Sequence, residues 1–189
     1  MKIITFKNIL YLSIFFHIIA AIFSSGFQHF DEHFQIVEFL NFKLGGIKTS
    51  ELPWEFREKI RPWFQVYIYY FITKCLNFFN ITSPFFIVFT LRLLTGLFGL
   101  YSIVSIFPLL RKWFRHRRAL LLSWIGLNLF WFIPYIQVRT SSESFSISFI
   151  LLGLSIFLSK NNNHHLAKKF LLSGILFGLA YLSRSKIGI

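Results

Sequence analysis

Residues 84–118, PFFIVFTLRLLTGLFGLYSIVSIFPLLRKWFRHRR, decide the fold. The first part, residues 84–110, is almost wholly apolar, and a helix needs roughly 20 such residues to cross the hydrocarbon core of a bilayer. The stretch ends in a basic cluster made of Arg111, Lys112, Arg115, Arg117 and Arg118. Because basic clusters beside apolar segments stay in the cytoplasm, we predict a membrane-spanning helix that ends on the cytoplasmic side.

The composition of the whole chain agrees with a membrane protein. Of its 189 residues 55% are hydrophobic, and the mean hydropathy is +0.61. The net charge of +13 comes from short clusters between apolar runs, so it does not indicate a nucleic-acid partner. The single cysteine, Cys75, excludes an internal disulfide framework. We therefore expect an all-α, polytopic membrane protein surrounded by membrane lipids.

The order of the apolar runs predicts the topology. The runs are 8–26, 64–80, 84–110, 119–138, 145–159 and 170–183. The basic residues near the N-terminus, after residue 110 and around 160–169 can share the cytoplasmic side only if one run does not cross. The short run 64–80 has polar residues on one helical arc, which favours an interfacial helix; they are Gln65, Thr73, Asn77 and Asn80. Residues 28–83 then form one long extracytoplasmic segment.

Acidic residues are concentrated in that segment, beginning with QHFDEHFQIVEF at residues 28–39. Six of the seven acids lie between positions 31 and 58: Asp31, Glu32, Glu38, Glu51, Glu55 and Glu58. In one interpretation the first acids are solvated and cap a helix that begins near residue 31. In a second, HFDEH is a zinc-peptidase motif. In a third, a carboxylate at the membrane surface is a general base for a hydroxyl acceptor, while nearby cations hold an anionic leaving group.

Three further charged positions are expected on the same side of the membrane. Arg92 lies inside an apolar run, where an arginine has a functional role, pairs with Glu143 or snorkels to an interface. The loop VRTSSES at residues 138–144 contains Arg139, and Ser141 or Ser142 of this loop could start the next helix. Arg184 follows the last apolar run. Opposite charges gathered at one membrane face predict a site for an anionic lipid.

Four of these motifs, taken in order, resemble those of a known enzyme family. They are HFDEHFQIVEF at 29–39, LPWEFREKIRPW at 52–63, the arginine at 92 and RTSSE at 139–143. The chain thereby resembles mannosyltransferases of the GT-C superfamily, which use a polyprenyl-phosphate mannose donor in GPI-anchor and N-glycan assembly and have bacterial relatives. Phe30, Pro53 and Val66 depart from the family pattern of Pro, Thr and Pro, which leaves the sugar and the acceptor open.

The resemblance implies roles for single residues. Asp31 matches the catalytic base and Glu32 its acidic neighbour. The other family positions are expected to bind substrate. In the first motif they are His29, Gln35 and Glu38, and in the second Trp54, Glu55 and Arg61. Beyond these motifs, the cations expected near the lipid phosphate are Arg92, Arg139 and Arg184, with Glu143 as the acid of the third motif.

The resemblance also implies a fold and a reaction. Family members are longer, so residues 1–189 correspond to the N-terminal part of a GT-C transmembrane module, whose first extracytoplasmic loop carries interfacial helices. The implied enzyme is an inverting glycosyltransferase that moves a mannosyl or related hexosyl group from a polyprenyl-phosphate donor to a lipid-linked or glycan acceptor. The alternative is a non-catalytic membrane protein that binds a lipid phosphate, or an inactive transferase fragment.

Cofactor and location follow from the same comparison. No cofactor and no metal ligand set is indicated, although assistance by a divalent metal ion stays open. The active face is expected to be extracytoplasmic, in either a bacterial inner membrane or an endoplasmic reticulum membrane.

Overall fold

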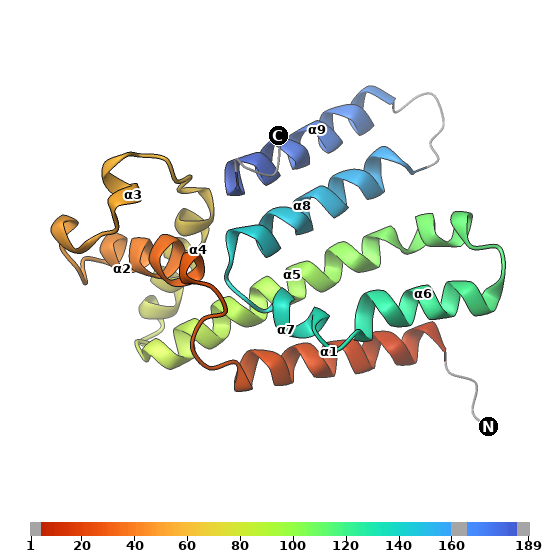
Figure 1. Ribbon diagram of the computed structural model, residues 1–189, viewed down its shortest axis with the longest axis horizontal. Coiled ribbons are helices and arrows are strands. Elements are labelled where there is room, and N and C mark those ends of the chain that lie inside the picture. Colours follow the sequence, from red (N-terminus) through yellow and green to blue (C-terminus); the bar gives the residue numbers. More distant parts are fainter. Residues whose placement is uncertain (1–4, 160–165, 185–189) are drawn as a thin grey trace.

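Long apolar helices run side by side through the molecule (Figure 1). The structure is a computed structural model that describes residues 5–159 and 166–184. The helices are α1 (Phe6–Phe23), α5 (Pro84–Trp113), α6 (Arg117–Leu129), α8 (Ser142–Phe157) and α9 (Leu166–Ser183). Within the described residues, α1, α5 and α9 are long and apolar enough to cross a membrane, and α8 is a shorter apolar helix. The prediction of an all-α polytopic membrane protein is confirmed.

The connections between these helices separate the charges to opposite ends of the molecule. The α5–α6 turn, which carries the basic cluster, lies at the same end as the first residues of α1, the last residues of α8 and the first residues of α9 (Figure 1). The acid-rich segment and the start of α8 lie at the other end. This arrangement is the one expected from the basic clusters. The predicted basic positions near residue 2 and at 160, together with the polar run 161–165, lie outside the described residues.

The acid-rich segment folds into short helices that extend beyond the ends of the long ones (Figure 1). They are the π-helix η1 (Glu32–Val37), α2 (Glu38–Leu44), the 3₁₀ turn η2 (Thr49–Glu51), α3 (Trp54–Arg57) and α4 (Phe64–Phe78). A hydrophobic core joins this segment to the bundle: Ile36, Phe39 and Val66 pack with Leu91 of α5 and Phe145 of α8. The segment is therefore fixed on the bundle by buried apolar contacts.

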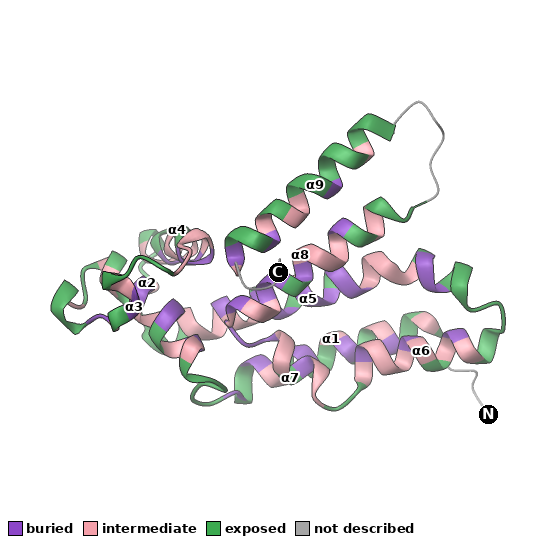
Figure 2. Cartoon of the chain, turned by 45° about the horizontal axis from the view of Figure 1, so that its top comes forward, coloured by how far each residue is buried: buried purple, intermediate pink, exposed green. Residues whose placement is uncertain are grey.

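Helix α4 confirms the polar arc predicted for the run 64–80, and the structure shows which way that arc faces. In Figure 2 α4 is seen end on, while the long helices lie across the view. Gln65 and Thr73 are buried against the protein, whereas Phe71 and Phe78 are exposed. Asn80 does not belong to the arc, because it follows the helix in a left-handed conformation with φ 60°. The aromatic face is the outer one, as suits a helix in contact with lipid.

The run 119–138, predicted as one span, is broken. Helix α6 ends at Leu129, and the chain turns through Phe130 and Phe132 before the short helix α7 (Ile133–Gln137) begins. Pro134 lies in the first turn of α7, where its missing N–H costs no helical hydrogen bond. The break lets the backbone turn, so that α7 packs against both α1 and α5.

Small residues of α5 allow that close packing. A Cβ atom at Gly96 would lie 2.7 Å from Val138 Cγ1, and one at Gly99 would lie 3.1 Å from the side chain of Gln137. The buried His17 of α1 has Nε2 2.6 Å from Gln137 Oε1. Segment 137–138, immediately before Arg139, is therefore held between α1 and α5.

We expect Gly96→Ala to destabilise the protein, because the added methyl group would overlap Val138, which is fully buried. Overpacking of this kind costs about 1–3 kcal/mol of unfolding free energy. Gly178→Ala in α9 is the matched control, since a Cβ atom added there would have nothing within 4 Å. Unfolding of the detergent-solubilised protein would be followed by circular dichroism; equal stability of both variants would contradict the packing described.

Candidate active site

The first motif forms the π-helix at the start of the acid-rich segment. In η1 the N–H of Glu38 donates to the carbonyl oxygen of His33, five residues earlier. The wide turn places Asp31 and Glu32, which are neighbours in sequence, in different surroundings. Asp31 makes no capping bond, so the interpretation that it caps the helix is wrong, although a helix does begin at residue 32. Turns of this type are common at functional sites.

Glu32 is buried and bound by backbone and side-chain donors. Its Oε1 accepts hydrogen bonds from the N–H of Thr140 at 3.1 Å and from the Thr140 hydroxyl at 3.0 Å. Its Oε2 accepts from the N–H of Gln28 at 3.0 Å and lies 3.9 Å from Arg139 Nη1. The side chain of Glu32 is only 2% exposed. These donors compensate the carboxylate for the water that it loses on burial.

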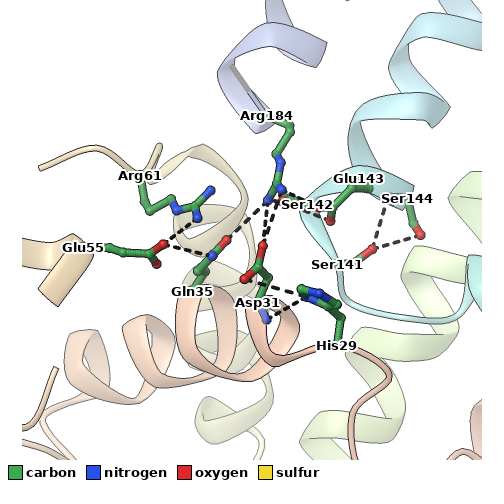
Figure 3. Close-up of polar contacts among 10 residues, drawn as sticks. All are labelled: His29, Asp31, Gln35, Glu55, Arg61, Ser141, Ser142, Glu143, Ser144 and Arg184. Carbon is green, nitrogen blue, oxygen red and sulfur yellow. Dashed lines mark hydrogen bonds and ion pairs between the residues drawn. The ribbon is translucent and has the colours of Figure 1, made fainter. Parts of the chain in front are cut away.

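Asp31 belongs to a second cluster of polar contacts, in which its carboxylate meets Arg184 (Figure 3). Both terminal nitrogens of Arg184 lie 3.4 Å from Asp31 Oδ2, and Arg184 Nη2 lies 2.7 Å from Glu143 Oε1. His29 Nδ1 lies 3.7 Å from Asp31 Oδ1. The Asp31 side chain is 25% exposed, against 2% for Glu32. Asp31 is therefore the acid of the pair that a second molecule can reach.

Gln35 connects this cluster to the second sequence motif. Arg184 Nη1 donates to Gln35 Oε1 at 3.3 Å, and Gln35 Nε2 donates to Glu55 Oε1 at 3.4 Å. The same oxygen of Glu55 accepts from Arg61 Nη2 at 2.5 Å (Figure 3). The motifs at residues 29–39 and 52–63 thus meet the end of α9 in one chain of polar contacts.

Arg92 and Arg139 converge on the backbone that leaves α1. Arg92 donates to the carbonyl oxygens of Ser24 and Gly26, and Arg139 Nη1 donates to the carbonyl oxygen of Gly26 at 3.0 Å. The predicted alternative of an Arg92–Glu143 salt bridge is wrong, because Glu143 pairs with Arg184 instead. The Nε atoms of Arg92 and Arg139 are buried without a partner in the described part of the chain.

A groove of about 560 Å³ opens beside Arg92. The end of α1, the turn 24–27, η1 and the first turns of α5 form its walls, which are mostly apolar and include Phe23, Phe85 and Phe89. Arg92, Glu32 and His33 also line it. An apolar groove with a guanidinium group at its side is suited to an anion on a hydrocarbon chain.

Several residues named from the sequence lie apart from both clusters. Trp54 is exposed, and Glu38 pairs with His33 at 3.2 Å. The two histidines of HFDEH do not converge, since His29 faces Asp31. Among residues 5–159 and 166–184, no group of three His, Cys, Asp or Glu side chains is arranged to hold a metal ion. The zinc-peptidase interpretation therefore has no ligand set there.

The structure brings to the site residues to which the sequence analysis gave no role there. Thr140 supplies two of the donors to Glu32, and Ser142 Oγ accepts from Arg184 Nη1 at 3.1 Å. Gln65 of α4 donates to the carbonyl oxygen of Thr140 at 3.1 Å and to the Tyr69 hydroxyl at 3.0 Å. Thr140 and Ser142 stand within RTSSE, whose serines the sequence analysis considered only as the start of the next helix. Ser141 caps α8 as predicted, accepting from the N–H of Ser144.

Tyr69 completes the polar contacts between α4 and α5. Its hydroxyl lies 2.6 Å from the hydroxyl of Thr95, which donates in turn to the carbonyl oxygen of Leu91. Burial raises the pKa of the Tyr69 hydroxyl to about 12, so the group stays protonated and available for hydrogen bonding. This contact, with the bond from Gln65, holds α4 against the site.

Comparison with known proteins identifies the family of the chain. The model of the Alg9-like mannosyltransferase family matches residues 8–189. No curated protein and no solved structure matches the chain. The match begins within α1 and runs to residue 189, so it includes all four sequence motifs, at 29–39, 52–63, 92 and 139–143. The chain belongs to the Alg9-like mannosyltransferase family and is a membrane glycosyltransferase of the GT-C type.

Proposed function

We propose that this protein transfers a mannosyl or related hexosyl group from a polyprenyl-phosphate donor to a hydroxyl group of a lipid-linked or glycan acceptor. The observation that carries this proposal is the difference between the two adjacent acids. Asp31 is partly exposed and held by Arg184, whereas Glu32 is buried with its oxygens occupied. A base must reach the proton that it removes, and Asp31 meets that condition.

The reaction needs a base and a cation, but no acid. The acceptor oxygen attacks the anomeric carbon and passes its proton to the Asp31 carboxylate. The bond from that carbon to the phosphate oxygen breaks, and the electron pair leaves with the polyprenyl phosphate, which gains one negative charge. Attack opposite the leaving group inverts the anomeric configuration. A cation beside the phosphate stabilises the charge that develops there.

Arg92 is the candidate for that cation. It lines the apolar groove, and its guanidinium group binds only backbone carbonyl oxygens in the described part of the chain. Phe27 and His33, which lie before and after Asp31 in sequence, line the same groove. A prenyl chain in the groove would bring its phosphate to Arg92 beside the turn that carries Asp31. Arg139 is 3% exposed and acts by holding Glu32 and Gly26.

The site lies at the end of the molecule opposite the basic α5–α6 turn. By the positive-inside rule that turn is cytoplasmic, so the proposed reaction takes place on the extracytoplasmic face. The same rule fits a bacterial inner membrane and an endoplasmic reticulum membrane. In either, the prenyl-linked donor would reach the site from the lipid phase.

Asp31→Asn should lower kcat by about 10²–10⁴-fold, because the amide cannot accept the acceptor's proton. The measurement is mannosyl transfer from a prenyl-phosphate donor to a membrane-extract acceptor. Glu58→Gln is the control, since Glu58 is an exposed acid of the same segment. If the two variants lose activity equally, or neither loses any, the assignment of Asp31 as base fails and the binding-only alternative gains support.

Glu32→Gln should lower the stability of the folded protein. The amide cannot accept all the donors that now surround the carboxylate, and Arg139 is left without its buried partner. Breaking a buried pair of this kind costs roughly 3 kcal/mol of unfolding free energy. Thermal unfolding of both variants in detergent compares the two acids, and Glu32→Gln should lose more stability than Asp31→Asn. A larger loss of stability in Asp31→Asn would reverse the proposed roles.

Arg92→Lys tests the donor phosphate. Lysine keeps the charge but lacks the planar fork that a guanidinium group offers to phosphate oxygens. We expect kcat/KM for the prenyl-phosphate donor to fall roughly tenfold, with the acceptor KM unchanged. Lys74→Gln on the exposed side of α4 is the control for a loss of charge. An effect confined to the acceptor KM would place the donor elsewhere.

A further inference from the structure

A second cavity, formed by the acid-rich segment, lies outside the donor groove and has no role in the reaction as proposed above. It measures about 710 Å³, within the roughly 300–1,000 Å³ that small-molecule sites occupy. Its lining residues include the aromatic Phe39, Phe56 and Trp63 and the hydroxyl-bearing Thr49 and Ser50. Aromatic faces with a few hydroxyl groups suit a sugar, which has both apolar C–H faces and hydroxyl groups.

The cavity is positively charged. Arg57, Lys59 and Arg61 line it, with Glu55 as the acid among its lining residues. Glu55 is already paired with Arg61 at 2.5 Å. Neither Arg57 nor Lys59 forms an ion pair with any described residue. Two cations therefore face the cavity without a counter-charge in the described chain, and the Nε atom of Arg61 is buried without a partner there.

The backbone at Lys59 is unusual for this residue type. Lys59 has φ 53°, in the left-handed region, and its N–H donates to the carbonyl oxygen of Phe56 at 3.2 Å as α3 ends. Glycine is the residue that helices usually place at such a position, because it has no Cβ to clash. A lysine there keeps a conformation that glycine would adopt with less strain. Strained residues of this kind gather at ligand sites.

The cavity is also connected to the cluster around Asp31. Arg61 lines it and binds Glu55, Glu55 accepts from Gln35, and Gln35 accepts from Arg184 beside Asp31 (Figure 3). Helix α3 lies farther from the bundle than η1 does (Figure 1). A glycan whose hydroxyl group is at Asp31 would therefore extend its distal part, away from the membrane, toward this cavity.

We propose that this cavity binds a saccharide that carries an acidic group, a phosphate or a carboxylate, through Lys59 and Arg57. The aromatic walls take the sugar ring and the two cations take the anion. A role of this cavity in selecting the acceptor rests on the proposed transferase function. Binding itself does not, because it requires neither donor nor turnover.

Lysine acetylation followed by mass spectrometry tests the site in the full chain, reconstituted in nanodiscs of neutral phosphatidylcholine. Mannose 6-phosphate should slow acetylation of Lys59 about fivefold, as one charge-assisted contact would. Lys74, exposed on α4 and absent from the cavity lining, is the internal control and should not change. Mannose alone should protect neither lysine. Protection of neither lysine, or of both, by mannose 6-phosphate would overturn the proposal.

Lys59→Gly distinguishes a binding role of Lys59 from a purely structural one. Glycine relieves the left-handed strain, so thermal stability should be equal or higher, while affinity for mannose 6-phosphate should fall about tenfold. Asn80→Gly is the matched control, because Asn80 has φ 60° after α4 and does not line the cavity. It should gain less stability, because asparagine tolerates the left-handed region better than lysine, and it should keep its affinity. Wild-type affinity in Lys59→Gly would refute the assignment.

Replacing part of the neutral lipid by an anionic lipid tests whether the cations bind a saccharide or a lipid head group. If nanodiscs containing phosphatidylserine protect Lys59 without any added sugar, the cations bind lipid head groups and the saccharide proposal fails. Asp31→Asn separates the catalytic role of Asp31 from binding in the cavity: loss of transfer with intact protection of Lys59 supports both. Intact transfer in Asp31→Asn rejects the proposed base alone, and absent protection rejects the cavity alone.

Discussion

The buried carboxylate of Glu32 holds the two halves of the site together. It accepts hydrogen bonds from Gln28 and from Thr140, which is 108 residues away in sequence, and it lies close to Arg139. An ionised group so deeply buried would be costly without these donors. The turn after α1 and the turn before α8 must therefore stay together. Their contact makes one site of the first and third sequence motifs.

The exposure of Asp31 follows from that burial. With Glu32 fixed toward Thr140, the wide turn of η1 directs the preceding residue toward the end of α9, where Arg184 meets it across 153 residues of sequence. Arg184 also binds Glu143 and Ser142 at the start of α8. The accessible carboxylate is thus held by Arg184 after α9, and Arg184 is held in turn by the start of α8. Such support from several elements keeps a reactive side chain in a defined position.

Buried polar side chains elsewhere in the protein also face polar partners within the chain. Gln65 and Tyr69 of α4 point inward to Thr140 and Thr95, while the aromatic side of α4 is exposed. The buried His17 of α1 contacts Gln137 beside the glycines of α5. In a protein surrounded by lipid, polar side chains gain most from partners inside the protein. These contacts hold the segments that carry the site.

The sequence by itself determined that the protein is a helical membrane protein and which loops lie at the same end of it, because hydropathy and basic clusters act locally along the chain. It also determined the family, through motifs that can be read in order along the chain. It also pointed to the acids and arginines of the four motifs. It did not foresee the break after Leu129, the inward direction of the α4 polar arc or the pairing of Arg184 with Asp31. Those were decided by the tertiary structure, because they depend on contacts between residues far apart in sequence. Only folding buries Glu32 between the turn after α1 and the turn before α8 and leaves Asp31 accessible. Two adjacent acids are chemically alike until their surroundings differ.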